Sequence, residues 1–222
     1  MTPAPQDPLV SALGRPLGPT CPVADVRAAA DDLLRRWDEP HRAYHTRTHL
    51  LETLGALATL LTHEPAPPRT VDVGALELAV WFHDAVYDGR PGDDEEASAV
   101  LAERVLPGLG QRPERVAEVA RLVRLTARHD PAPDDVAGRL LCDADLAILA
   151  ALAPDYAAYT AAVRQEYAHV PDAAFRAGRA AVLRELVAHG PLYRTAAGRR
   201  LWQGPALTNV RAELARLTSP RC

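Results

Sequence analysis

The sequence contains no lysine, and all 25 of its basic residues are arginine. Isoleucine and asparagine each occur once, as Ile148 and Asn209, whereas alanine and proline are abundant. We attribute this bias to the base composition of the coding genome, so it points to no particular function. The formal net charge of -4 is more informative, because a chain without excess positive charge is not expected to hold a nucleic-acid duplex.

Cysteine and long hydrophobic runs are also scarce. Cys21, Cys142 and Cys222 are far apart and odd in number, which indicates neither a disulfide framework nor a CxxC metal site. No apolar run approaches the roughly 20 residues that cross a membrane. The opening segment "MTPAPQDPLV" lacks the charged start and apolar middle of a signal peptide. We therefore expect a protein of the reducing cytoplasm with no membrane partner.

Strand patterns are missing as well. Prolines and glycines separate segments of helical periodicity, and no convincing run alternates apolar and polar residues. The 222 residues, 48% of them hydrophobic, suffice for one substantial core. We predict an all-α fold, with an irregular proline-rich segment over residues 1–22 and one helical domain over residues 23–217. Helices are expected at residues 23–37, 46–63, 72–88, 94–106, 113–128, 144–152, 155–169, 173–189 and 206–217.

What the sequence does contain is a set of ionisable residues in apolar surroundings. In "VWFHDAVYDGR", residues 80–90, His83 and Asp84 end a nearly unbroken apolar run. Burying a carboxylate without a partner is costly, so this pair faces either water or a cation. The segment "LLCDADLAILA" repeats the anomaly with Asp143 and Asp145. Asp143 is also a suitable N-cap for the helix expected after it, which is the simpler interpretation for that residue alone.

A histidine pair precedes these motifs. "YHTRTHLLETL" places His45 and His49 four residues apart, on one face if both are helical. Thr46 stands where the zinc-protease motif HExxH needs its glutamate, which argues against that alternative. For a single histidine at a helix start, a structural role is the usual interpretation.

Taken together, two histidines and two aspartates at the ends of core helices can converge on one divalent cation. Imidazole and carboxylate ligands suit Mn, Fe, Co, Ni or Zn, with positions left for water and substrate. The same cation would supply the partner that Asp84 needs. On these grounds alone, Asp143 and Asp145 both remain candidates for the final ligand.

The order of these residues, with His49 first, His83-Asp84 next and Asp145 last, resembles the HD superfamily of metal-dependent phosphohydrolases. The neighbouring segments make the resemblance more specific, because they are similar, in the same order, to one bacterial branch, the predicted metal-dependent HD phosphohydrolases. The resemblance covers roughly residues 30–217 and implies an all-helical HD-domain bundle. The segments are "PHRAYHTRTHL", "WFHDAVYD", "DDEEASA", "LTARH", "CDADLAILA", "YTAAVRQEYAHV" and "FRAGRAAVLRELV".

The resemblance also implies a set of metal ligands. In the family the final aspartate generally precedes a leucine-type residue, which favours Asp145 over Asp143. The implied cofactor is one divalent metal ion, with Mn, Fe, Co, Ni, Zn and Mg as candidates. The residues that match the ligand pattern are His49, His83, Asp84 and Asp145.

Residues around this set are candidates for proton transfer and substrate binding. Asp84, Glu95 or Glu96 would act as general acid or base, although acids also suit the first turn of a helix. Asp94 stands where the branch's N-E-E-x-S-A pattern has asparagine. The candidate substrate contacts nearby are His45, Ser98 and His129, and His129 is alternatively a ligand for a second ion.

Binding a phosphate group also requires positively charged side chains. Arg42 is the first choice, both to bind the substrate and to balance charge in the transition state. Arg164, with Tyr167, is the second choice, because a planar guanidinium binds two phosphate oxygens at once. For Arg179 a structural salt bridge is an equal alternative. Tyr159 is a candidate nucleobase contact, although aromatic residues at helical spacing more often belong to the core.

We therefore expect a hydrolase that cleaves a phosphomonoester or phosphoanhydride, most simply of a nucleotide or a related small phosphate. Two alternatives stay open. One is a nucleotide-binding regulatory HD module without turnover, which would have no need of an intact ligand set. The other is a di-iron HD oxygenase, which requires more histidine and carboxylate ligands than those placed here.

Overall fold

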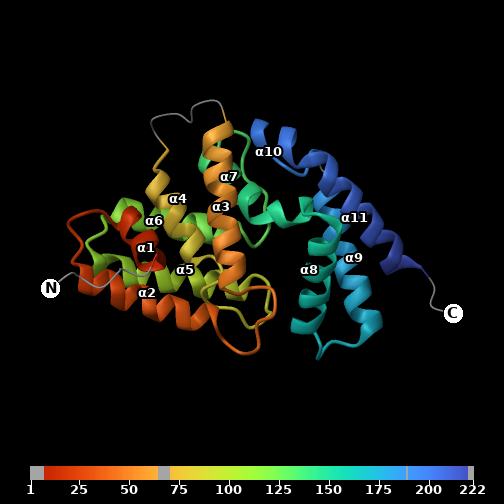
Figure 1. Ribbon diagram of the computed structural model, residues 1–222, viewed down its shortest axis with the longest axis horizontal. Coiled ribbons are helices and arrows are strands. Elements are labelled where there is room, and N and C mark those ends of the chain that lie inside the picture. Colours follow the sequence, from red (N-terminus) through yellow and green to blue (C-terminus); the bar gives the residue numbers. More distant parts are fainter. Residues whose placement is uncertain (1–7, 65–70, 189, 220–222) are drawn as a thin grey trace.

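Figure 1 shows a computed structural model of the chain, which describes residues 8–64, 71–188 and 190–219. Over these residues the chain is all-α, as predicted, and has no strand. None of the helices in this part of the chain combines the length and the hydropathy needed to cross a membrane. The helices are α1 (Pro8–Leu17), α2 (Val23–Trp37), α3 (Arg47–His63), α4 (Val73–Phe82), α5 (Asp93–Val105), α6 (Pro113–Leu125), α7 (Val136–Asp145), α8 (Ala153–Glu166), α9 (Asp172–Ala188), α10 (Ala196–Leu201) and α11 (Gln203–Thr218), with 3-10 helices η1 (Leu106–Leu109) and η2 (Leu146–Ala150).

The main hydrophobic core forms around α4. This helix, "VGALELAVWF", is apolar on nearly every side, and Trp81 and Phe82 are fully buried. A helix of this kind needs neighbours on all sides, and α1, α3, α6 and α7 provide them. The core therefore surrounds the stretch of chain that leads directly into His83 and Asp84.

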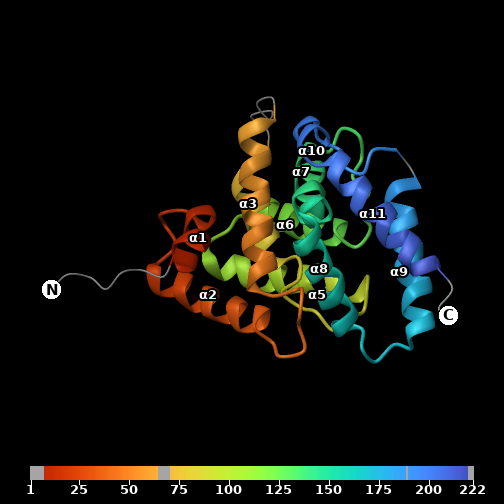
Figure 2. The same ribbon diagram turned by 45° about the vertical axis from the view of Figure 1, so that its right-hand side comes forward.

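A second, smaller hydrophobic cluster joins η2 to the C-terminal helices. It includes Leu149 of η2, Tyr156 of α8, Leu183 of α9 and Val210 of α11. Figure 1 shows α8, α9 and α11 grouped at the opposite end of the molecule from α1 and α2, and Figure 2 again shows α9 and α11 at that end. The passage from α7 into η2 links the two clusters, and Asp145 lies at that passage.

The N-terminal segment is not irregular throughout, contrary to the prediction for residues 1–22. Residues 8–17 form α1, and its Val10, Leu13 and Leu17 are buried in the main core at helical spacing. Two prolines obscured this pattern in the sequence. Pro8 begins the helix, where no backbone donor is required, and Pro16 lies in the last turn. Residues 1–7 lie outside the described residues.

Helix α4 ends at Phe82, before the predicted limit of residue 88. The segment that follows is held as a turn by Ser98 of α5. Its hydroxyl accepts a hydrogen bond from the Val86 N–H at 3.0 Å and lies 3.2 Å from the Val86 carbonyl oxygen, to which it donates. Ser98 is fully buried in this role. The candidate substrate contact Ser98 thus supports the backbone that carries His83 and Asp84.

Asp143 is not the N-cap of a helix that begins at residue 144. It lies inside the last turn of α7, which starts at Val136 and was not predicted over these residues. Its buried carboxylate accepts hydrogen bonds from the Arg194 and Thr195 N–H groups at 2.7 and 2.8 Å, and from the Thr195 hydroxyl at 2.6 Å. Asp143 therefore anchors the start of α10, a helix that was also not predicted.

Candidate metal centre and its cavities

Three helix ends bring candidate metal ligands together. His49 lies in the first turn of α3, whose N-cap Thr46 accepts a hydrogen bond from the Thr48 N–H at 3.3 Å. His83 follows the last residue of α4, and Asp145 is the last residue of α7. His49 and His83 are 3% and 1% exposed, so the group lies inside the protein.

The ligand atoms lie at separations that a shared ion would impose. His49 Nε2 is 3.1 Å from His83 Nε2 and 3.0 Å from Asp145 Oδ1, and His83 Nε2 is 3.4 Å from that oxygen. Atoms that bind one cation at about 2.1 Å lie about 3.0–3.4 Å apart at neighbouring octahedral or tetrahedral positions. His49, His83 and Asp145 thus form a buried group that can hold a metal ion.

Asp84 lies beside the same two imidazoles. Its Oδ2 is 3.0 Å from His83 Nε2 and 3.5 Å from His49 Nε2. Among the described residues, however, the set whose ligand atoms all lie within 4.8 Å of one another consists of His49, His83 and Asp145. Asp84 stays a predicted ligand, adjacent to this set.

The donor pattern of His83 shows that a cation suits the group. His83 Nδ1 lies 2.9 Å from the Val80 carbonyl oxygen, which can only accept, so Nδ1 carries the proton. In the neutral ring, Nε2 then offers a lone pair to the space shared with His49 and the two carboxylates. Trp37 packs against His83 with ring centroids 5.5 Å apart, which limits the orientation of the imidazole. Buried nitrogen and carboxylate donors arranged in this way fit a divalent cation.

The imidazoles and carboxylates of this group strongly shift one another's pKa. Burial alone would lower the pKa of His83, but Asp84 and Asp145 hold it well above its ordinary value. Burial alone would raise the pKa of each aspartate, but His83 and the neighbouring imidazoles hold both well below the ordinary range. Both carboxylates are therefore ionised, which is the form that binds a metal, and a bound cation would displace the proton that the raised pKa of His83 otherwise keeps on Nε2.

His129 holds Asp145 from the other side. Its Nε2 is 2.8 Å from Asp145 Oδ2, which leaves Oδ1 to face His49 and His83. Among the described residues, His129 is the only non-glycine residue with a positive φ, at 50°. A non-glycine residue in this region costs about 1–3 kcal/mol and persists only where its surroundings hold it there. The structure thus places His129 where it positions the final aspartate.

The structure adds Glu166, the last residue of α8, which we did not predict as a site residue. Its Oε1 accepts hydrogen bonds from the N–H groups of Ala43, Tyr44 and His45 at 2.8, 2.8 and 3.0 Å. Its Oε2 is 2.8 Å from His45 Nδ1 and 2.9 Å from the Tyr87 hydroxyl. Burial would raise the pKa of Glu166, but hydrogen bonds from His45 and the amides lower it to about 2. The sequence holds no signal for this role, because the loop partners lie 121 to 123 residues earlier.

We call His49, His83 and Asp145 the metal group. Two of its members, His49 and Asp145, line a first cavity, which Arg179 of α9 also lines. Arg179 is fixed by hydrogen bonds from Nε to Glu213 Oε1 and from Nη2 to the Tyr159 hydroxyl, both 2.8 Å. No hydrogen bond between described residues uses its Nη1. Burial would lower the pKa of Arg179, but Tyr159 and Glu213 raise it above its ordinary value, so the group stays charged. The predicted site residues that line this cavity are His45, His49, Asp84, Glu95, His129, Asp145 and Tyr159.

Arg42, the first choice for binding phosphate, does not line this cavity. Its side chain is fully buried, and its donors are directed to protein acceptors. Nη1 donates to the Asp84 and His45 carbonyl oxygens at 2.7 and 3.1 Å, and Nε donates to Glu39 at 3.1 Å. Arg42 therefore braces the loop before α3 against the turn after α4.

Three further predicted site residues also lie away from the cavity lining. Arg164 donates to the Tyr167 and Val170 carbonyl oxygens and so closes the end of α8. The ring of Tyr167 packs near Phe175, with centroids 6.1 Å apart. Glu96 pairs with Arg124 at 2.7 Å on the exposed surface.

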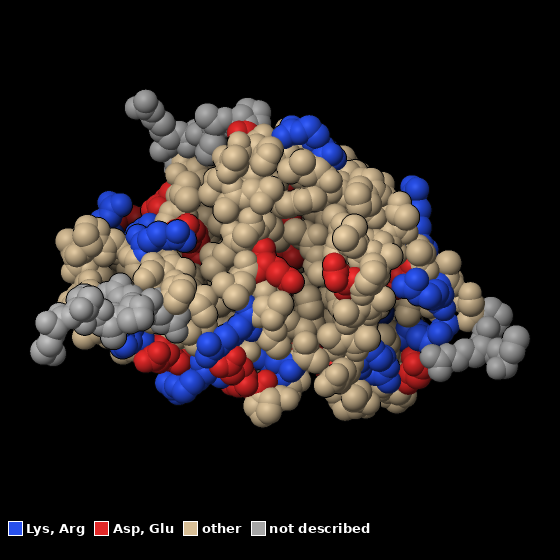
Figure 3. Space-filling model, in the orientation of Figure 1, with Lys and Arg blue, Asp and Glu red and all other residues tan. Residues whose placement is uncertain are grey.

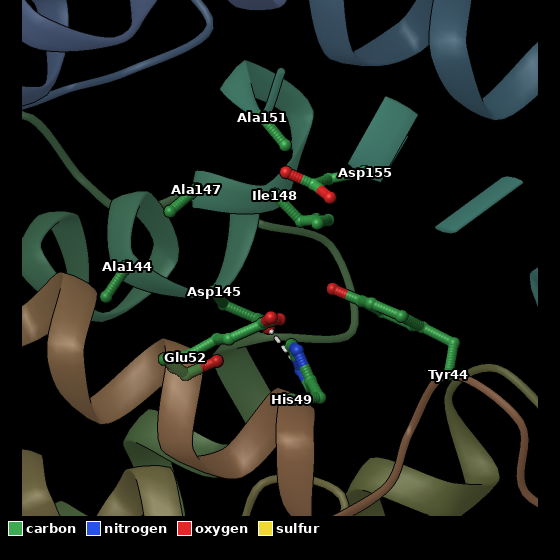
Figure 4. Close-up of a pocket in the computed structure, with 10 residues that line it drawn as sticks. Tyr44, His49, Glu52, Ala144, Asp145, Ala147, Ile148, Ala151 and Asp155 are labelled. Atoms are coloured by element: carbon green, nitrogen blue, oxygen red, sulfur yellow. Dashed lines mark ion pairs between the residues drawn. The ribbon is translucent and has the colours of Figure 1, made fainter. Parts of the chain in front are cut away.

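A second cavity touches another side of the metal group (Figure 4). The figure shows the Tyr44 hydroxyl pointing into this space, with Asp145 and Asp155 on either side. In the space-filling view, acidic side chains lie around a hollow near the middle of the face (Figure 3). Besides four apolar residues, the lining consists of Tyr44, His49, Glu52, Thr53, Asp145 and Asp155.

Comparisons of the chain with family models, with curated proteins and with solved structures find no match.

Proposed function

We propose that this protein is a metal-dependent phosphohydrolase that cleaves a phosphomonoester or phosphoanhydride of a nucleotide or similar small phosphate. One observation supports this most directly: His49 and Asp145, two members of the His49–His83–Asp145 group, line the same cavity as Arg179. Imidazole and carboxylate donors suit a borderline divalent metal, and a charged guanidinium suits the anionic oxygens of phosphate.

A divalent cation held by this group would polarise a phosphoryl oxygen and make water more acidic. The residues of the chain supply the rest. Arg179, already ordered by Glu213 and Tyr159, would bind a phosphoryl oxygen without the entropic cost of fixing a free side chain. His45 and Glu95 line the same cavity and, with Asp84, are the candidates for proton transfer.

A neighbouring cavity suits the remainder of the substrate. It shares His129 and three apolar residues of its wall with the first cavity. An apolar wall next to a phosphate site accommodates a leaving group with a hydrophobic body, such as a nucleoside. The shared apolar residues are Leu146, Val182 and Leu186.

The first experiment compares metal content and phosphate release in the wild type, Asp145→Asn and Glu103→Gln. Asp145→Asn removes a charged ligand, whereas Glu103→Gln removes an exposed carboxylate that pairs with Arg124. We expect the wild type and Glu103→Gln each to bind about one metal ion per chain. Both should also release phosphate from members of a nucleotide panel when Mn, Co, Ni or Mg is added. Asp145→Asn should lose both properties. A wild type that stays metal-free and inert in every case would contradict the proposal.

The role of Arg179 requires a variant that leaves no unpaired buried charge. Arg179→Met combined with Glu213→Gln removes the two partners together, because a lone buried Glu213 would itself destabilise the protein. We expect this double variant to bind metal as the wild type does and to have a phosphate affinity about tenfold or more weaker. Unchanged phosphate affinity would exclude Arg179 as the phosphate-binding cation.

A further inference from the structure

Tyr44 carries a polar atom that the fold does not use. Its hydroxyl oxygen is buried and has no hydrogen-bond partner in the part of the chain that the structure describes. Native proteins pair nearly all buried polar groups, because an unpaired hydroxyl has lost its bonds to water without replacement. An unpaired buried hydroxyl beside a candidate active site therefore indicates a ligand.

The position of this hydroxyl is well defined. The Tyr44 N–H donates to Glu166 Oε1 at 2.8 Å, which fixes the backbone. The ring lies between His49 and Tyr159, with centroid distances of 4.7 and 4.6 Å, and contacts His45 edge-on at 4.8 Å. A side chain held on these sides keeps its hydroxyl in one place before any ligand arrives.

The hydroxyl faces the space next to the metal group. Tyr44 lines both cavities, and both include His49 and Asp145. Figure 4 shows the oxygen pointing away from the Tyr44 backbone, toward the cavity beside Asp145. Arg179 lines the first of these cavities. A ligand at the metal group would thus meet a charged donor from Arg179 and a neutral donor from Tyr44.

We propose that the Tyr44 hydroxyl donates a hydrogen bond to an oxygen of the phosphate group bound at the metal group. The inference rests on the proposed function and adds to it a substrate-binding residue. The hydroxyl forms no hydrogen bond with any described residue, and phosphate oxygens are strong acceptors that would relieve its unpaired state.

The test uses Tyr44→Phe, which removes only the unpaired oxygen. Tyr193→Phe serves as a comparison for stability, because its hydroxyl donates to the Leu146 carbonyl oxygen at 2.9 Å. Mn²⁺ binding, inorganic phosphate binding to the Mn²⁺-loaded protein and Tm are measured for each protein. We expect Tyr44→Phe to keep its Mn²⁺ affinity and its Tm, and to bind phosphate about tenfold more weakly. Tyr193→Phe should lower Tm.

Two results would overturn the inference. Phosphate affinity of Tyr44→Phe within about twofold of the wild type would show that the hydroxyl does not touch the ligand. A fall in Tm equal to that of Tyr193→Phe would show that the hydroxyl has a structural partner. If the wild type itself binds neither Mn²⁺ nor phosphate, the proposed function fails first and this inference fails with it.

Discussion

At the scale of single residues, Glu166 connects the loop before α3 to the C-terminal helices. Its side chain is 2% exposed, and it accepts hydrogen bonds from three consecutive backbone amides as well as from His45 and Tyr87. Hydrogen bonds to an ionised group stabilise more than those to a neutral one. The position of His45 in the cavity therefore depends on the charge of a residue that does not itself line it.

We predict that Glu166→Gln lowers the free energy of unfolding at neutral pH by about 2 kcal/mol. Folding lowers the pKa of Glu166 from 4.5 to about 2, so its stabilising contribution is complete above 4.5. The contribution is lost as the pH falls from 4.5 toward 2, because over this range the unfolded state binds a proton that the folded state does not.

Urea unfolding of the wild type and Glu166→Gln at pH 7 and near pH 3 measures this contribution. The difference between the two proteins should be smaller at the lower pH. Equal differences at both pH values would mean that the ionised carboxylate is not the source of the stability.

At this scale the sequence could predict the metal group, whereas it could not predict which arginine lines the cavity beside that group. His83, Asp84 and Asp145 each interrupt an apolar pattern, so their residue type and position are anomalous within a few residues of sequence. Arg42 and Arg179 have no such local distinction among 25 arginines. Their roles follow from which acceptors surround each guanidinium, and those acceptors come from distant segments.

At the scale of elements, the start of α10 packs tightly on the end of α7. A Cβ at Gly198 of α10 would lie 2.5 Å from Asp143 Oδ2 and 2.9 Å from the Thr195 hydroxyl oxygen. Asp143 cannot easily move, because three hydrogen bonds hold its carboxylate. Gly178 of α9 is the opposite case, since a Cβ there would meet nothing within 4 Å.

We predict opposite effects of alanine at these two glycines. Gly198→Ala should lower the free energy of unfolding by about 1–3 kcal/mol through overpacking. Gly178→Ala should raise it by up to about 1 kcal/mol, because alanine favours the helix and no neighbour obstructs its methyl group. Thermal and urea unfolding of the two variants check the signs, and stabilisation by Gly198→Ala would contradict the packing described for α7 and α10.

Element boundaries were predictable where the signal is local. The predicted limits of α2, residues 23–37, agree with the structure, because its apolar spacing is uninterrupted. The start of α7 and the whole of α10 were missed. Helix α10 has only six residues, and its anchor, Asp143, comes from α7. A short helix that is held by a residue from a distant segment shows little periodicity in its own sequence.

At the scale of the whole molecule, the residues of the metal group come from the ends of three helices, α3, α4 and α7. They lie where the chain passes from the main core to the second, smaller hydrophobic cluster. A cation that binds only the folded state stabilises it by mass action, by about 2.7 kcal/mol at one hundred times Kd. For a chain of this length we expect Mn²⁺ at that excess to raise Tm by about 5–10 °C over the EDTA-treated protein.

Differential scanning calorimetry of the wild type and Asp145→Asn, each with Mn²⁺ and with EDTA, measures this effect. The metal-dependent shift should vanish in Asp145→Asn. A shift of the same size in both proteins would place the stabilising ion at some other position.

By itself, the sequence determined the all-α class, most of the helices and the candidate metal ligands. These depend on periodicity, capping and the presence of charge within apolar runs, which are properties of short segments. Only the tertiary structure decided that Asp143 is an anchor, that Arg179 and Tyr44 line the cavity beside the metal group, and that Glu166 holds His45 in place. Each of these assignments depends on which side chains meet across the fold, and those partners are brought together by packing of distant helices.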